Sequence, residues 1–248
     1  MSSKTGIEWT EATWNIAVGC EKVDQDCARC YMYRDSYNGT RYNPRQIRKT
    51  KSVFTLPLKL KEPKKIFTCS LTDFFHPAID EYRVEAWDII RRCPQHTFQI
   101  LTKRPERILD NLPPDWGAGW SNVWMGTSIG SNAGLVRLPY LQSIPAKTRF
   151  VSFEPLLEDI ELSPGQLHGI DWVIIGGESG NKTGPYKYRP CNIDWFAYLH
   201  GVARAAGCAV FIKQLGTYLA REYGLQSRHG KDPDEWPFQW MKTREFPK

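Results

Sequence analysis

Short apolar runs rich in β-branched residues recur along the chain, and most are followed by a polar or glycine-rich turn and then by helical spacing. This alternation is typical of repeated βα units, which build parallel sheets covered by helices. The predicted strands are 14–19, 65–70, 97–102, 123–128, 149–153, 172–176 and 209–213. The pattern therefore predicts an α/β fold, a single partial or full (β/α) TIM-type barrel with about six to seven parallel strands.

The segments between these strands have the spacing of helices. Helices are predicted over 30–36, 81–93, 105–111, 135–142 and 192–206. Asp80 is expected to cap the start of the second helix. Barrels of about 250 residues commonly form one unit, and no linker or fixed-period repeat interrupts the 248 residues. We therefore expect a single domain over 1–248, with 217–248 as a C-terminal extension.

Composition and cysteine usage indicate a cellular location. No run of eighteen apolar residues is present, and the N-terminal residues lack the pattern of a signal peptide. The chain is therefore expected to be cytoplasmic and not bound to a membrane. Of its seven cysteines, Cys69, Cys93, Cys191 and Cys208 are scattered, and we interpret them as small buried hydrophobic residues.

The other three cysteines lie close together. Cys20, Cys27 and Cys30 fall within eleven residues, and no fourth cysteine is near them. Clustered thiols in a reducing compartment are more often ligands than disulfides. A structural zinc site requires a fourth ligand, and the nearest histidine, His76, is 46 residues from Cys30. A [4Fe-4S] cluster held by three cysteines would instead leave one iron open for a small molecule.

Active sites of such barrels gather at the carboxyl ends of the strands, so the residues at the end of each predicted strand and directly after it are candidates. Almost all of these positions are polar. They are Ser70, Thr72, Asp73, Thr102, Lys103, Arg104, Thr127, Ser128, Glu154, Gly177, Glu178, Lys213 and Gln214.

The cysteine segment and its surroundings resemble two related groups of proteins. Three cysteines after the first strand, followed by Tyr31 and a helix, resemble the cluster loop of the radical S-adenosylmethionine superfamily, although the usual spacing there is three and then two residues. Nearly the whole chain is similar to a phage- and bacterium-associated radical-S-adenosylmethionine-like family of largely undefined function, the phage Gp37/Gp68-like proteins with a three-cysteine motif. The matching segments are 7–15, 19–20, 27–31, 56–58, 70–76, 97–107, 122–126, 153–156, 171–180 and 211–214.

This resemblance implies a radical S-adenosylmethionine enzyme with two cofactors. Cys20, Cys27 and Cys30 would hold a [4Fe-4S] cluster, and S-adenosylmethionine bound to its open iron would yield a deoxyadenosyl radical, with electrons from an external donor. The cofactor needs partners for its ammonium, carboxylate and ribose groups. We place Ser70 and Asp73 near its amino acid end and Lys103 or Arg104 near its carboxylate. Glu154, Gly177 and Glu178 remain candidates for ribose or substrate contacts.

Several of these residues also have simple structural interpretations. The segment 176–180 is either a ligand contact or a glycine turn that leaves a strand. Lys213 is a candidate catalytic cation or only the end of a strand. His76 is a candidate proton donor or a packed side chain beside aromatic residues.

The substrate class is predicted from charge and aromatic content. A net charge of +6, basic residues between 41 and 65, and many aromatic residues favour nucleic acid or a nucleotide-derived substrate. Two alternatives remain. One is a non-catalytic nucleic-acid-binding protein in which the cysteines hold zinc, and the other is a cluster protein that transfers electrons or senses redox state.

Overall fold

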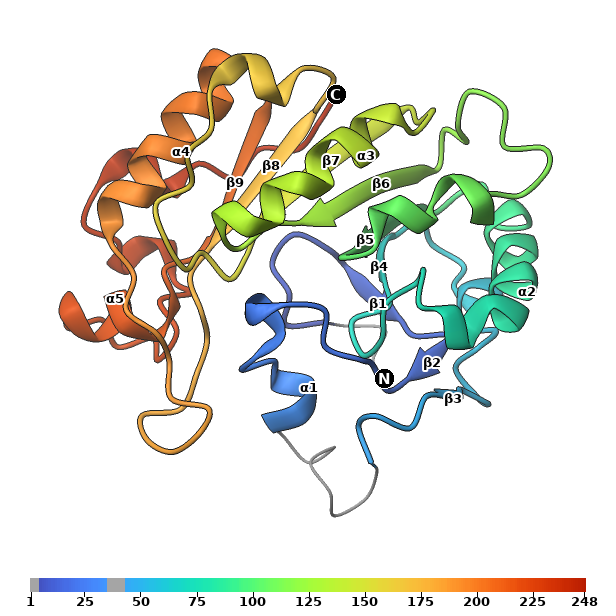
Figure 1. The fold of residues 1–248 in the computed structure, drawn as a ribbon, viewed down its shortest axis with the longest axis horizontal. Helices are drawn as coiled ribbons and strands as arrows, with labels where there is room; N and C mark the ends of the chain where they lie inside the picture. The colour runs from blue at the N-terminus through green and yellow to red at the C-terminus, as the bar shows by residue number, and fades with distance from the viewer. Residues whose placement is uncertain (1–4, 35–42) are drawn as a thin grey trace. The chain divides into compact units, whose positions relative to one another are not determined.

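A computed structural model of the chain describes residues 5–34 and 43–248. In these residues the main sheet has seven strands in the order β1-β4-β5-β6-β7-β8-β9, the order of a (β/α) partial barrel (Figure 1). The strands are β1 (Ala12–Trp14), β4 (Lys65–Thr68), β5 (Thr97–Thr102), β6 (Val123–Ser128), β7 (Thr148–Phe153), β8 (Trp172–Gly176) and β9 (Ala209–Gln214). The predicted α/β fold and partial barrel are confirmed.

The described chain groups into two compact units. The first is built from Met1–Lys22, Met32–Thr127 and Pro139–Thr148, and the second from Val23–Tyr31, Ser128–Leu138 and Arg149–Lys248. Whether they act as one domain, with 217–248 as an extension, stays a prediction.

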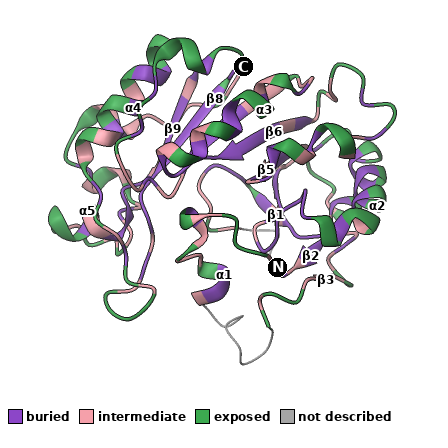
Figure 2. Cartoon of the chain, in the orientation of Figure 1, coloured by how far each residue is buried: buried purple, intermediate pink, exposed green. Residues whose placement is uncertain are grey.

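The first unit contains the parallel pairs β1–β4, β4–β5 and β5–β6. Trp14 pairs with Thr68, which pairs with Ile100. These strands are largely buried, and helix α2 (Asp80–Arg91) has both buried and exposed residues, as the purple and green segments of Figure 2 show. The indole of Trp14 is fully buried and lies edge-on to Phe98, with 5.7 Å between ring centroids.

The second unit contains the parallel pairs β7–β8 and β8–β9. Helix α4 (Ile193–Ala205) packs against β8 and β9, and α5 (Gly216–Glu222) follows β9. Trp172 is fully buried between Phe150 and Phe211, and its indole nitrogen donates to the carbonyl of Glu245 at 2.8 Å. The C-terminal residues therefore close one side of this core.

The first strand differs from its prediction. It ends at Trp14 rather than at Gly19, and Ala17–Val18 (β2) instead pairs antiparallel with Arg48–Lys49 (β3). The side chain of the buried Asn15 explains the break, because its Oδ1 accepts the backbone N–H of Leu71 at 2.7 Å. The carbonyl of Leu71 in turn accepts from the backbone N–H of Gly19 at 3.1 Å.

Gly19 makes this path possible. Its φ of +110° lies in the region that favours glycine, and a Cβ there would lie 2.7 Å from the carbonyl oxygen of Gln46. Gly19, the residue before Cys20, is thus hydrogen-bonded to Leu71 and lies close to the backbone of Gln46.

The predicted helices over 81–93 and 192–206 are confirmed with shifted ends as α2 and α4, and the other three match only in part. Helix α1 covers Tyr31–Arg34, and positions 35 and 36 of its prediction lie outside the described residues. Residues 105–111 form two 3-10 turns, Pro105–Arg107 and Leu109–Asn111, and 135–142 is covered by a 3-10 turn at Asn132–Val136 and by α3 (Arg137–Ser143). Among the described residues, no helix has the length and apolar character needed to cross a membrane.

The predicted cap of α2 was wrong. Ile79 precedes the helix, and Asp80 is its first residue and makes no side-chain capping bond. The Asp80 carboxylate is instead bound by Arg83 at 2.7 Å and Arg107 at 2.9 Å. These guanidinium groups compete for the oxygens that a cap would offer to backbone N–H groups.

Candidate metal centre and active-site rims

The cysteines fall into two groups by burial. Cys20, Cys27 and Cys30 are partly exposed, whereas Cys69, Cys93, Cys191 and Cys208 are buried. Burial raises the pKa of the Cys191 thiol to about 12 and of the Cys208 thiol to about 11, and it also raises the pKa of Cys69 and Cys93. The buried four therefore stay protonated thiols, and metal ligands must be thiolates.

Local backbone bonds organise the cysteine segment, residues 20–30. In the first unit the backbone N–H of Cys20 donates to the carbonyl of Pro44 at 2.9 Å. In the second unit, Asp24 caps a 3-10 turn, Gln25–Cys27, and the N–H of Cys30 donates to the carbonyl of Cys27 at 3.3 Å. No group of three or more His, Cys, Asp or Glu side chains in the described residues forms a ready metal site.

Asp73 is the centre of the first rim, the residues at the carboxyl ends of β4 and β5 and directly after them in the first unit. Its carboxylate accepts the backbone N–H of Phe75 at 2.9 Å, the hydroxyl of Thr102 at 2.6 Å and the backbone N–H of Lys103 at 2.9 Å. Arg104, which is also buried, adds an ion pair at 3.3 Å. The structure thus brings Asp73, Lys103 and Arg104 together, and both carboxylate oxygens of Asp73 are already engaged.

Arg104 links this rim to the cysteine segment. Its second guanidinium nitrogen donates to the carbonyl of Glu21, the residue after Cys20, at 3.2 Å. Ser70 has another role, because its hydroxyl accepts from the side-chain amide of Asn15 at 3.0 Å.

His76 is buried beside this rim and has a defined tautomer. Its Nδ1 accepts the backbone N–H of Ala78 at 3.0 Å, so Nε2 carries the proton. Nε2 makes no hydrogen bond among the described residues and lies 3.8 Å from the carboxylate of Glu21. Burial lowers the pKa of His76, and the nearby Arg104 guanidinium lowers it further. His76 is therefore a neutral donor near pH 7.

The lowered pKa of His76 predicts a loss of stability in acid. Unfolded histidine takes up a proton near pH 6.5, and folded His76 does so only at lower pH, so the unfolded state binds more protons in between. The contribution of neutral His76 to the free energy of unfolding is complete above pH 6.5. It is lost as the pH falls through the pKa of His76 in the folded state.

We expect His76→Asn, which keeps an acceptor for Ala78, to lose less stability between pH 7.5 and pH 5 than the wild type. The free energy of unfolding in urea at both pH values measures this. The exposed His168→Asn variant is the control and should follow the wild type. Equal losses in all three proteins would contradict the assignment.

The second rim consists of residues at the carboxyl ends of β7, β8 and β9, or directly after them, in the second unit. Glu154 and Lys213 form an ion pair there, and the amide of Gln214 lies 3.4 Å from the Glu154 carboxylate. Both charged side chains are largely buried, with 20% and 14% exposed. Gly176 lies beneath them, because a Cβ at that position would be 3.2 Å from the carboxyl carbon of Glu154.

Glu178 has a partner that the sequence did not reveal. Arg189 donates to the Glu178 carboxylate from its backbone N–H, at 2.8 Å, and from two guanidinium nitrogens. Arg189 also donates to the carbonyl of Gln25 at 2.9 Å. Gly177 is needed for packing, since its Cβ would lie 2.1 Å from the carbonyl oxygen of Leu215. The glycine turn interpretation therefore has direct steric support.

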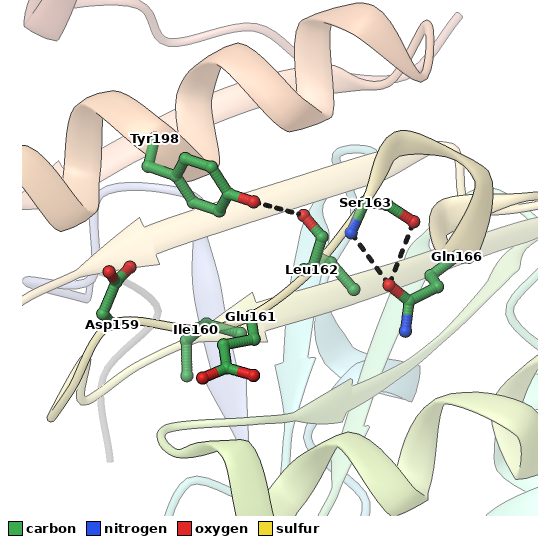
Figure 3. A pocket seen from close by; sticks show the side chains of 7 residues that line it. All are labelled: Asp159, Ile160, Glu161, Leu162, Ser163, Gln166 and Tyr198. Atoms are coloured by element: carbon green, nitrogen blue, oxygen red, sulfur yellow. Dashed lines mark hydrogen bonds between the residues drawn. The ribbon is translucent and has the colours of Figure 1, made fainter.

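The second unit also has an open cavity of about 430 Å³ (Figure 3). It is lined by Asp159, Ile160, Glu161, Leu162, Ser163, Gln166 and Tyr198. The hydroxyl of Tyr198 donates to the carbonyl of Leu162 at 3.0 Å, and the backbone N–H of Ser163 donates to Gln166 at 2.8 Å. None of the predicted site residues lines it.

The strand order defines the chain as an α/β partial barrel, and its fold is similar to that of a solved structure. A solved structure of a spore photoproduct lyase mutant, a radical S-adenosylmethionine enzyme, is similar with a TM-score of 0.52 and 12% sequence identity over 81% of this chain and 75% of that chain. The chain belongs to DUF5131, a family described as proteins of unknown function, whose model matches residues 4–245. No curated protein gives a significant match.

Proposed function

We propose that this protein is a radical S-adenosylmethionine enzyme whose [4Fe-4S] cluster is held by Cys20, Cys27 and Cys30. The observation that carries the proposal is the division of the cysteines. The only partly exposed thiols among the described residues lie together on the segment that follows β1 and β2, and the other four are buried and protonated. The fold similarity to spore photoproduct lyase supports the same class.

The donor set fits the cluster better than it fits zinc. Zinc draws four ligands to one point at about 2.0–2.3 Å, whereas each thiolate of a four-iron cluster binds a different iron. Three thiolates on one loop therefore suit a cluster without having to meet at a single point. When bound, the cluster supplies the electron that breaks a carbon–sulfur bond of S-adenosylmethionine, and an external donor supplies that electron to the protein.

The first rim supplies polar groups for the cofactor. We assign Lys103 and Arg104 to the cofactor carboxylate and Ser70 to its amino acid end. Asp73 belongs to the same subsite, where its four contacts orient Arg104 and the backbone of Lys103. A preorganised cation binds a carboxylate without first having to lose conformational freedom.

The second rim supplies groups for the ribose or the substrate. Glu154, Gly177 and Glu178 are assigned there, with Lys213 as a catalytic cation. Because Lys213 is mostly buried and paired with Glu154, a substrate anion would have to share or displace that ion pair. His76 is assigned as a proton donor, since its Nε2–H is directed away from the backbone contact made by Nδ1.

For the substrate we propose nucleic acid or a nucleotide-derived molecule, and for the setting a phage-associated one in the cytoplasm. Partly or fully exposed basic side chains at Arg45, Arg48 and Lys51 could contact phosphates, and the net charge of +6 favours a polyanion. The competing proposal is a zinc- or cluster-containing protein that binds nucleic acid or senses redox state without turnover.

The deciding experiment is anaerobic iron–sulfur reconstitution of the wild-type protein, followed by reduction in the presence of S-adenosylmethionine and chromatography for 5′-deoxyadenosine. We expect about four irons per chain and formation of 5′-deoxyadenosine. Tightly held zinc with no cluster would overturn the enzyme proposal in favour of the binding protein. A cluster without cofactor cleavage would favour electron transfer or sensing.

A further inference from the structure

Two aspartates between Cys20 and Cys27 contact one arginine, and all three residues lie in the second unit. Nη2 of Arg137 pairs with the carboxylate of Asp24, and Nη1 lies 3.6 Å from the carboxylate of Asp26. Nη1 also donates to the carbonyl of Ser128 at 2.9 Å. The side chain of Arg137 is 8% exposed and that of Asp26 is fully buried.

The rest of this site holds Asp26 closely. The backbone N–H of Gly130 donates to its carboxylate at 3.0 Å. A Cβ on Gly130 would lie 2.8 Å from the carboxyl carbon of Asp26 and 2.4 Å from the carbonyl oxygen of Pro155. Only glycine therefore lets the backbone approach the buried carboxylate this closely.

Asp24 connects Arg137 to the backbone of Cys27. Its carboxylate accepts the backbone N–H of Asp26 at 2.8 Å and of Cys27 at 3.3 Å, which starts the 3-10 turn that ends at Cys27. The N–H of Cys30 then donates to the carbonyl of Cys27. A chain of contacts thus runs from Arg137 through Asp24 to both cysteines.

We propose that Arg137 is a positioning residue that holds Cys27 and Cys30 in place through Asp24 and Asp26. A six-residue spacer is costly to order, because each residue loses backbone freedom on binding a cluster unless it is already fixed. A buried carboxylate without its cation is strongly unfavourable. When Arg137 is removed, the side chain of Asp26 therefore moves towards solvent, and the 3-10 turn Gln25–Cys27 becomes less ordered. The consequence for cluster binding rests on the proposed function, whereas the ordering of the turn does not.

The first test uses the cluster-free protein and the rate at which iodoacetamide alkylates each cysteine, mapped by mass spectrometry. In Arg137→Gln we expect Cys27 and Cys30 to react about tenfold faster than in the wild type, because the turn opens locally. Cys191 and Cys208 should stay slow, which shows that the fold persists. Arg204→Gln, which removes an exposed ion pair of the same unit, is the matched control and should leave all rates unchanged.

Unchanged labelling of Cys27 and Cys30 in Arg137→Gln, with the buried cysteines protected, would overturn the proposal. If the buried cysteines also react, Asp24→Ala decides, because it removes the cap of the turn while Asp24 is partly exposed and Arg137 keeps Asp26 as a charged neighbour. Faster labelling confined to Cys27 and Cys30 in that variant would support the proposal, and wild-type rates would overturn it.

The second test follows the reconstituted cluster. Its loss to a chelator, read from visible absorbance, should be about tenfold faster in Arg137→Gln than in the wild type or Arg204→Gln. Arg137→Lys keeps the charge but not the forked geometry of the guanidinium group. Its rate of cluster loss should lie between those of Arg137→Gln and the wild type. Equal loss rates in all four proteins would overturn the positioning role. A wild type that assembles no cluster would overturn the proposed function, while the alkylation test would still decide the role of Arg137.

Discussion

Replacing Cys27 with alanine is expected to abolish most iron binding, whereas replacing Cys208 with alanine should leave the iron content at the wild-type level. A cluster with only two protein thiolates is exposed to solvent at two irons, so it is lost on desalting. Cys208 is buried, and burial raises its pKa to about 11, so it supplies no thiolate near neutral pH. Iron and acid-labile sulfide per chain after anaerobic reconstitution and desalting measure both effects.

Cys20 and Cys30 should behave like Cys27 when replaced singly. Cys191→Ala is a second buried control, and circular dichroism establishes that each variant is folded. Loss of iron from the Cys191 or Cys208 variant, with retention in the Cys27 variant, would mean that the ligand set is wrong. Retention of zinc in place of iron would favour the binding protein instead.

Replacing Asp73 with alanine is expected to destabilise the first unit by about 3–5 kcal/mol, because the change leaves a buried cation without its partner. Arg104 loses its ion pair, and the backbone N–H of Lys103 loses its acceptor. The free energy of unfolding from urea titration measures the loss.

Asp115→Ala is the matched control, since its pair with Arg91 is exposed and contributes little to stability. Asp73→Asn keeps an acceptor and should lie between alanine and the wild type. If Asp73→Ala unfolds at the wild-type urea concentration, Asp73 is not the centre of the first rim.

The strands could be predicted because burial on both faces leaves a clear sequence signal. The runs at 97–102, 123–128 and 172–176 match β5, β6 and β8 at both ends. Each is rich in apolar and β-branched residues and begins after a polar residue, and each has the length of a buried strand. The first strand was misplaced because Asn15 ends it through a bond to Leu71, 56 residues away, which no local pattern contains.

The positions of the rim residues were predictable, but their partners were not. The sequence rule that polar groups follow strands located Asp73, Glu154 and Glu178. Their environments depend on long-range pairs, such as Glu154 with Lys213 and Glu178 with Arg189. Arg189 lies in a loop without periodicity, so only its charge could have drawn attention to it.

Arg137 and the two aspartates were missed for a different reason. Residues 21–26 have the sequence character of a spacer between cysteines, although they include Asp24 and Asp26. Acidic residues in a spacer usually suggest a solvated loop, and Asp26 is instead fully buried. An arginine at the start of a predicted helix carried no sign that it would pair with them.

The hydrogen bonds to Leu71 fix where the cysteine segment begins, whatever the number of residues in the segment. Asn15 accepts from the backbone N–H of Leu71, and Gly19 donates to the carbonyl of Leu71. The path of the chain to Cys20 is therefore set by the segment that follows β4. Insertions or deletions after Cys20 would change the path of the residues that follow without moving Cys20 itself. Related chains can therefore differ in the number of residues before their second cysteine and still begin the segment at the same place on the sheet.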